Sequence, residues 1–178
     1  MRTEEVLNSA GEPEAAPDPV AMLTRLFREH HLELVRMALL IVGDKPTAED
    51  VVQDVFTAMH DRLDRLHEHH AMLPYARTAV INRCRTVLRR RKLASRLHQH
   101  HEPPVWSAES AAMLGEDCRE VFEALRSLPR RRREVLVLRY YLNLSDAEIA
   151  EVMGVSGGTV KSTMSRALTA LAKKLEDS

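Results

Sequence analysis

The stretch Gly154–Arg166, GVSGGTVKSTMSR, decides the fold of the C-terminal part of the chain. Two adjacent glycines stand where a helix begins, and hydroxyl and basic side chains follow with few apolar ones among them. Upstream, Ser145 and Glu148 have the spacing of a capping box, in which a hydroxyl and a carboxylate satisfy free amides at a helix start. Gly154 supplies a permissive turn, and Ser156 caps the next helix. The pattern predicts a helix-turn-helix.

The second helix of this motif is expected to present a polar face to DNA. Val160 and Met164 anchor its inner edge, and no acidic residue occurs between Ser156 and Lys174. Hydroxyl and basic side chains donate to base edges and phosphate oxygens, and glycine lets the backbone approach a phosphate closely. The alternative is a solvated helix that closes a small bundle. The candidate DNA-binding residues are Gly158, Thr159, Lys161, Ser162, Ser165 and Arg166.

The composition of the whole chain favours helices. At 178 residues it can hold one ordinary domain or two small ones, and 44% hydrophobic residues provide material for a core. Only 4% of the residues are aromatic, and apolar–polar alternation of useful length is missing from the sequence. We expect an all-α fold of two small helical domains joined by a flexible linker.

Cysteine usage and hydropathy favour a cytoplasmic protein. Cys84 and Cys118 lie far apart in a chain with no secretory n-region, so we expect both to be reduced thiols. The longest apolar run, Met37–Val42, is six residues long and cannot span a bilayer. We therefore expect no membrane insertion.

Periodicity divides the chain into four parts. Residues 1–17 have no period and are expected to form a disordered tail. Residues 18–93 have the apolar spacing of helices and form the first domain. Residues 94–116 lose that spacing and form the linker, and residues 117–178 form the helix-turn-helix domain.

Three helices are expected in the first domain. The first begins at about residue 19 and ends at a Gly43 C-cap. The second covers about 48–65 after an N-cap at Thr47. The third runs from Pro74 to about residue 93.

Basic residues gather on the third helix. Residues 76–101 carry eight Lys or Arg side chains and no Asp or Glu, although the formal net charge of the whole chain is zero. Helical spacing puts Asn82, Arg85 and Arg89 on one face, away from the apolar positions. A basic face of this length is suited to following DNA phosphates.

At these residues the chain resembles the extracytoplasmic-function (ECF) sigma factors, the compact two-domain class of sigma-70-type specificity subunits of bacterial RNA polymerase. LPRRRREVLVLRYYLNLSDAEIAEVMGVSGGTVKSTMSRAL at 128–168 is similar to region four, which docks on the polymerase flap and reads the minus-thirty-five element. AEDVVQDVF at 48–56 is similar to region 2.2. YARTAVINRCRTVLRRR at 75–91 is similar to regions 2.3 and 2.4, which open and read the minus-ten element. The resemblance covers about residues 20–93 and 117–175, and it implies a factor for promoter-specific initiation rather than an enzyme.

The resemblance also implies roles for individual residues. Asp50, Gln53 and Asp54 match positions that grip the clamp coiled coil of core polymerase, and on a helix they share one face. Tyr75 stands where the family usually has Trp. The implied minus-ten contacts are Tyr75, Asn82, Arg85, Arg89, His67, His69 and His70, with the histidines in the loop that captures a flipped base. The implied partners are core RNA polymerase, double- and single-stranded promoter DNA and an anti-sigma factor, and no cofactor is implied.

Other functions are weighed against this one. His98, His100 and His101 could bind zinc, but a site needs fixed geometry and these residues lie in the expected linker. A stand-alone helix-turn-helix regulator would normally carry a ligand or receiver domain, which residues 20–93 do not resemble. The sequence contains no Gly-rich phosphate loop, nucleophile elbow or HExxH motif. We expect neither a metal site nor catalysis.

Overall fold

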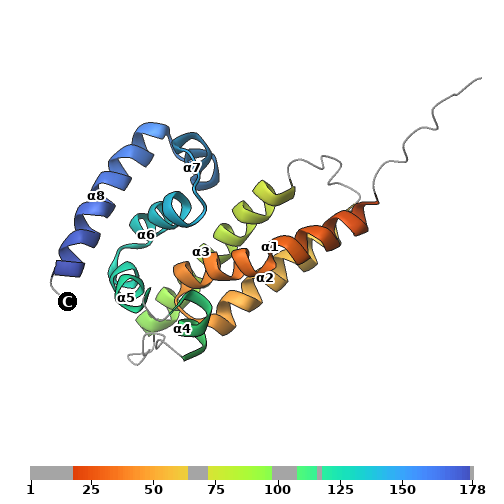
Figure 1. Ribbon diagram of the computed structural model, residues 1–178, viewed down its shortest axis with the longest axis horizontal. Coiled ribbons are helices and arrows are strands. Elements are labelled where there is room, and N and C mark those ends of the chain that lie inside the picture. The colour runs from red at the N-terminus through yellow and green to blue at the C-terminus, as the bar shows by residue number, and fades with distance from the viewer. Residues whose placement is uncertain (1–17, 64–71, 98–107, 116–117, 177–178) are drawn as a thin grey trace, which may run out of the picture.

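The computed structural model describes residues 18–63, 72–97, 108–115 and 118–176. All the regular structure in these ranges is helical, and none of it is a strand (Figure 1). The prediction of an all-α fold is confirmed. No helix in these ranges is both long enough and apolar enough to cross a membrane.

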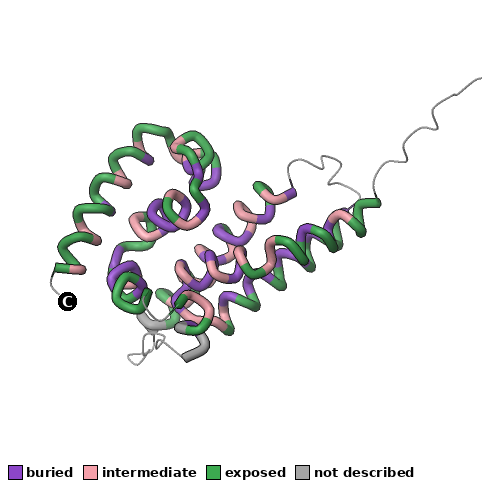
Figure 2. The backbone as a smooth tube through the Cα atoms, viewed as in Figure 1, coloured by how far each residue is buried: buried purple, intermediate pink, exposed green. Residues whose placement is uncertain are grey.

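The N-terminal unit consists of α1 (Pro19–Val42), α2 (Lys45–His60) and α3 (Met72–Leu97), which pack along one another. Apolar residues recur at helical spacing and form the buried stripes visible in Figure 2. Side chains with less than 2% exposure in this unit include Leu34, Met37, Leu39, Ile41, Val51, Met59 and Ile81.

Both ends of α1 are capped. The Asp18 side chain accepts a hydrogen bond from the Val20 amide at 3.0 Å. At the other end Gly43 has a φ of 95°, and its N–H donates to the Leu39 carbonyl oxygen at 2.8 Å. This left-handed conformation is costly for a residue with a Cβ. The predicted glycine C-cap is confirmed.

The predicted N-cap of α2 at Thr47 is wrong. Asp44 takes that position, because its side chain accepts from the Thr47 amide at 3.0 Å and the helix already begins at Lys45. Aspartate is the better N-cap of the two. Asp44 also accepts from Arg91 Nη2 at 2.9 Å, which ties the start of α2 to α3.

The other helix ends differ from the predictions as well. α2 ends at His60, short of the predicted residue 65, and a turn leads to buried Leu63. α3 continues to Leu97, past the predicted residue 93. Just before this extension, Arg91 Nη1 of α3 donates to the Val42 carbonyl oxygen at the end of α1, at 3.2 Å.

The predicted linker, 94–116, contains regular structure. It includes the end of α3 and a short helix, α4 (Ala108–Leu114), so the prediction of an irregular segment is wrong there. Arg36 Nε donates to the Met113 carbonyl oxygen at 2.9 Å. Because the last carbonyls of a helix have no partner within it, this bond satisfies the end of α4 and fixes it on α1.

The C-terminal unit consists of α5 (Arg119–Ser127), α6 (Arg130–Leu136), the π-helical turn η4 (Val137–Tyr141), α7 (Asp146–Met153) and α8 (Gly157–Glu176). η4 continues α6 directly, and the Leu142 amide donates to the Val137 carbonyl oxygen at 3.2 Å, the five-residue spacing of a π-helix. α8 packs against α5, α6 and α7. The core of this unit includes Phe122, Leu138, Ile149, Val160 and Ala167.

The two units are docked on each other. α5, α6 and η4 contact α1, and α7 contacts α3. Arg133 Nη1 of α6 donates to the Ile41 carbonyl oxygen at 2.6 Å. Arg85 of α3 donates to the Glu134 carboxylate through Nε and Nη2 at 3.0 to 3.2 Å. The sequence predicted only a loose tether, whereas the structure adds a specific interface.

Candidate nucleic-acid and polymerase interface

The helix-turn-helix has the predicted geometry. The Ser145 amide donates to Glu148 Oε2 at 2.7 Å, and the Glu148 amide donates to Ser145 Oγ at 3.3 Å, which completes the capping box of α7. The hydrogen bonds from the Ser145 hydroxyl and amide lower the pKa of Glu148. Gly154 ends α7 with a φ of 64°, and the Thr159 amide donates to Ser156 Oγ at 3.3 Å. The turn and both caps are confirmed.

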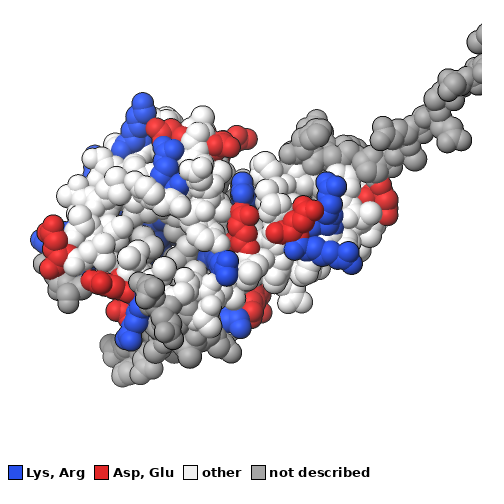
Figure 3. All heavy atoms as spheres, viewed as in Figure 1, with Lys and Arg blue, Asp and Glu red and all other residues white. Residues whose placement is uncertain are grey.

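One face of α8 is left open to a ligand. Val160 and Ala167 are buried against the unit, whereas Lys161 and Arg166 are exposed and form no ion pair within the described part of the chain. Figure 3 shows basic side chains projecting where α8 begins. Of the six predicted DNA-binding residues, Thr159 is half-buried and the other five are exposed: Gly158, Lys161, Ser162, Ser165 and Arg166.

The glycines at the start of α8 are not required by packing. A Cβ added to Gly157 would meet no atom within 4 Å, and one added to Gly158 would meet only Ser156 Oγ at 3.9 Å. The space over both residues is therefore open to an approaching phosphate.

The three predicted polymerase-binding residues share an exposed face of α2. Asp50, Gln53 and Asp54 are all exposed. Asp54 accepts from Arg83 Nε at 2.9 Å and also from Arg83 Nη2. Because an exposed ion pair contributes little free energy, this contact leaves Asp54 free to exchange partners.

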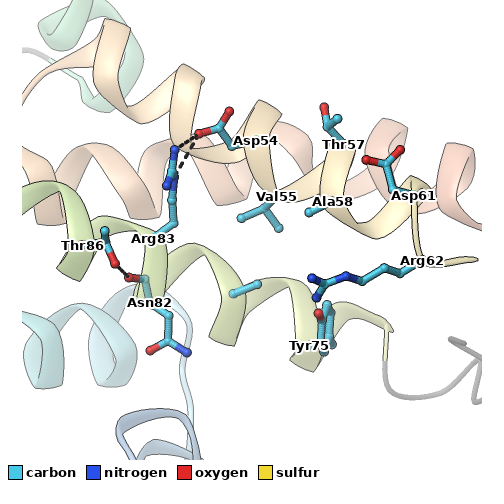
Figure 4. A pocket seen from close by; sticks show the side chains of 11 residues that line it. Asp54, Val55, Thr57, Ala58, Asp61, Arg62, Tyr75, Asn82, Arg83 and Thr86 are labelled. Carbon is cyan, nitrogen blue, oxygen red and sulfur yellow. Dashed lines mark hydrogen bonds and ion pairs between the residues drawn. The ribbon is translucent and has the colours of Figure 1, made fainter.

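A groove of about 520 Å³ lies between α2 and α3 (Figure 4). Its rim includes Tyr75, which is 41% exposed, and the Arg62 side chain extends toward it. Asn82 and Arg83 line the other end. The groove combines an exposed aromatic ring with two guanidinium groups, of which Arg83 is paired with Asp54, and Asp61 is a second carboxylate in its lining. Aromatic rings and arginines are the groups on which single-stranded nucleic acid binds.

Arg62 was not predicted from the sequence, because it lies after α2 and reaches Tyr75 only through the packing of α2 on α3. Arg83 was not predicted either, although it follows Tyr75 by eight residues and helical spacing therefore places both on one face of α3.

The predicted minus-ten face on α3 is assembled, but part of it is occupied. Arg85 Nη1 donates to Asn82 Oδ1 at 3.1 Å, and the rest of its guanidinium is held by Glu134. Arg89 is exposed and has no ion pair within the described residues. Glu134 was not predicted from the sequence either, although it follows Arg130 by four residues, the spacing of an ion pair on a helix. The two side chains lie 3.4 Å apart.

The structure does not describe the candidate histidines. His67, His69 and His70 fall outside the described residues, as do His98, His100 and His101. The described part of the chain contains no group of three or more His, Cys, Asp or Glu side chains that could hold a metal ion. Both cysteines are free; burial raises the pKa of Cys84 to about 12, so this thiol is not a nucleophile.

Both units match models of known protein families. Residues 26–94 match the family model for sigma-70 region 2, and residues 118–171 match the model for sigma-70, region 4. The RNA polymerase sigma-E factor of Streptomyces avermitilis is 32% identical over 143 residues, which cover 80% of this chain and 79% of that protein. The ECF RNA polymerase sigma factor SigM of Mycobacterium tuberculosis is 32% identical over 151 residues, which cover 85% of this chain and 76% of that protein.

The chain is an ECF sigma factor of the sigma-70 family. It serves transcription initiation as a non-enzymatic subunit of RNA polymerase, and its region 4 is the helix-turn-helix unit. The match to region 2 sets aside the alternative of a stand-alone helix-turn-helix regulator.

Two solved structures are similar to the structure of this sigma factor. CnrH, in complex with the cytosolic domain of CnrY, matches with a TM-score of 0.64 at 26% identity over 87% of this sigma factor and 88% of that chain. RpoE of Bartonella quintana, in complex with the anti-sigma factor NepR, matches with a TM-score of 0.72 at 24% identity. The match covers 86% of this sigma factor and 98% of that chain. The second likeness establishes a shared fold.

Proposed function

We propose that the sigma factor divides promoter recognition between its two units, with α8 binding the minus-thirty-five element. The observation that carries this proposal is the exposed polar face of α8, which has no acidic residue before Glu176 in the last turn. A recognition helix of this kind lies in the major groove and donates to base edges and phosphates. The contacting residues are Gly158, Thr159, Lys161, Ser162, Ser165 and Arg166.

The N-terminal unit holds core polymerase through Asp50, Gln53 and Asp54. This proposal is supported by their exposure on one side of α2, opposite the buried stripe that packs on α1 and α3. Side chains on such a face can bind a partner without contributing to the core. The partner surface is the clamp coiled coil, and the C-terminal unit contacts the flap.

The face of α3 and the adjacent groove bind the melted minus-ten element. Unpaired bases stack on aromatic rings while cations follow the phosphates, and Tyr75, Asn82, Arg85 and Arg89 supply these groups. The contribution of the loop histidines His67, His69 and His70 stays a prediction.

The functional domains in this proposal are residues 18–93 and 117–178, with 94–116 as the linker between them and 1–17 as a tail. The sigma factor acts in the cytoplasm with the polymerase. An anti-sigma factor is a further partner, because CnrH and RpoE were both solved in complexes, the latter with an anti-sigma factor.

The double variant Lys161→Ala plus Arg166→Ala tests the division of labour. We expect it to lose recognition of the upstream element while its affinity for core polymerase stays unchanged. Lys173→Ala, an exposed cation in the last turn of the same helix, is the matched control and should retain recognition. Loss of core binding in the double variant would contradict the proposal.

The salt dependence of promoter affinity is a second test of these phosphate contacts. If about six phosphates are neutralised, promoter affinity should fall roughly a thousandfold between about 50 and 200 mM salt, and the double variant should show a shallower slope.

A further inference from the structure

One side chain belongs both to the proposed polymerase-binding face of α2 and to the groove between α2 and α3. Asp54 is exposed beside Asp50 and Gln53, and it also lines the groove. Within the described residues it is the one member of these three that has an ion pair. Arg83 of α3 donates to its carboxylate through Nε, at 2.9 Å, and through Nη2 (Figure 4). This pair therefore connects the two surfaces.

The charges that line the groove cancel. Its lining contains two arginines, Arg62 and Arg83, and two carboxylates, Asp54 and Asp61. A phosphate that entered the groove would meet as many negative as positive side chains. A guanidinium binds carboxylates and phosphates with the same forked geometry. Asp54 and a DNA phosphate therefore compete for Arg83.

The pair between Asp54 and Arg83 can be exchanged for other partners. The two side chains are 52% and 39% exposed, and the loss of an exposed ion pair changes an equilibrium by only about two- to fivefold. A cation of a partner protein can take the place of Arg83 on Asp54. The groove then keeps both arginines but only one uncompensated carboxylate, that of Asp61, and its lining becomes attractive to a phosphate.

We propose that Arg83 is a further contact for a phosphate of single-stranded promoter DNA, and that exchange at Asp54 couples this contact to polymerase binding. Core polymerase pairs with Asp54, and the released Arg83 binds the strand that stacks on Tyr75. Coupling between two binding sites is reciprocal, so removal of Arg83 also affects the affinity for polymerase. This inference rests on the proposed roles of Asp54 in polymerase binding and of the groove in binding the minus-ten element.

The first test measures the affinity of the full chain for core polymerase by fluorescence anisotropy of labelled sigma factor. Arg83→Ala removes the competitor for Asp54, and we expect binding to become about two- to fivefold tighter. The matched control is Arg90→Ala, which removes an exposed cation of the same helix that has no ion pair within the described ranges. Its affinity should equal that of the wild type. Absence of a gain in Arg83→Ala, or the same gain in Arg90→Ala, overturns the proposal.

A double-variant cycle tests whether the gain depends on Asp54. In a chain that already carries Asp54→Ala, Arg83→Ala should bring no gain in polymerase affinity, because no carboxylate is left to be released. A gain of the same size in both backgrounds would show that Arg83 acts on polymerase binding by another route, and it would overturn the proposal.

The second test measures DNA binding by the full chain without polymerase, with a fluorescein-labelled single-stranded DNA 12-mer of random sequence. Asp54→Asn removes the charge that holds Arg83, and we expect about two- to fivefold tighter binding of this probe. Arg83→Ala in the same chain should abolish the gain. Glu49→Gln, which neutralises another exposed acid of α2, is the matched control and should bring no gain. An Asp54→Asn chain that stays folded by circular dichroism and gains no affinity contradicts the proposal.

Asp54→Ala separates this inference from the proposed function. If this variant binds core polymerase as tightly as the wild type, the assignment of Asp54 to polymerase binding fails. If it binds more weakly while Arg83→Ala brings no gain, the assignment of Asp54 stands and the coupling through Arg83 is rejected.

Discussion

Arg133 Nη1 of α6 donates to the carbonyl oxygen of Ile41, in the last turn of α1, at 2.6 Å. The next carbonyl oxygen, that of Val42, accepts from Arg91 Nη1 of α3 at 3.2 Å. The last carbonyls of a helix lack partners within it and carry partial negative charge. One arginine from each unit therefore stabilises the same helix end, and Gly43 follows directly at the junction of the two units.

Gly43→Ala should destabilise the protein. Its φ of 95° is unfavourable for alanine, and the added Cβ would lie 3.1 Å from Arg126 Nε of α5. We expect a loss of about 1 to 2 kcal/mol in the free energy of unfolding, measured by urea denaturation. Gly157→Ala is the control, because its Cβ would meet open space. Equal stability of the two variants would refute the packing of Arg126 on Gly43.

Asp44 should contribute stability that depends on pH. Partial burial alone would raise the pKa of its carboxyl, but hydrogen bonds from Thr47 and Arg91 outweigh this effect and lower the pKa below the usual 3.8. Because the folded-state pKa is the lower one, the contribution is complete above the unfolded-state pKa and is lost as the pH falls through the folded-state value.

Two substitutions of Asp44 distinguish the contribution of its N-cap hydrogen bond to stability from the contribution of its charge. Asp44→Ala should cost about 1 kcal/mol at neutral pH, whereas Asp44→Asn retains a good N-cap and should cost less. Acid unfolding followed by circular dichroism should show a weaker pH dependence below about 3.8 for Asp44→Asn than for the wild type. Identical acid profiles would be inconsistent with the ion pair to Arg91.

The acidic face of α2 should affect binding and not folding. Asp50→Ala combined with Asp54→Ala is expected to weaken core polymerase binding by about tenfold, measured by fluorescence anisotropy of labelled sigma factor. The unfolding free energy should change by less than about 0.5 kcal/mol, because both side chains are exposed. Glu49→Ala, which breaks the ion pair of exposed Glu49 with half-buried Lys45 at 3.6 Å, is the control. An equal loss of binding in this control would reject a specific contact.

Tyr75 should act through its ring. Tyr75→Phe is expected to retain promoter opening, whereas Tyr75→Ala loses a stacking surface worth about 1 to 3 kcal/mol per base. Permanganate reactivity of thymines in the minus-ten region of the holoenzyme complex provides the measurement. Failure of Tyr75→Phe would point instead to the hydroxyl as the contact group.

The helix ends show how far local sequence signals reach. The caps at Gly43, Ser145 and Gly154 were predicted correctly, because each depends on residues within one helical turn. The predicted start of α2 was wrong because two capping residues, Asp44 and Thr47, stand three apart, and the stronger N-cap of the two, Asp44, accepts from the Thr47 amide. Arg91, which is 47 residues from Asp44, donates to the side chains of both residues, so this contact does not decide between the two caps.

The surfaces also differ in how far the sequence predicts them. The polar face of α8 could be predicted from its spacing and from the lack of acidic residues between Ser156 and Lys174. The pairing of Arg85 with Glu134 could not, because the two residues are 49 apart and the contact depends on how the units dock. The π-helical turn at 137–141 also has no pattern of its own in the sequence.

Transcription from a promoter library by core polymerase and this sigma factor tests the division of promoter recognition most directly. We predict specific start sites with two upstream elements for the wild type. The Lys161→Ala, Arg166→Ala double variant should lose preference only at the distal element, and Tyr75→Ala should lose activity at the proximal one. This division of promoter recognition would be contradicted if transcription began at the same sites as with core polymerase alone. It would also be contradicted if both variants lost preference at the same element.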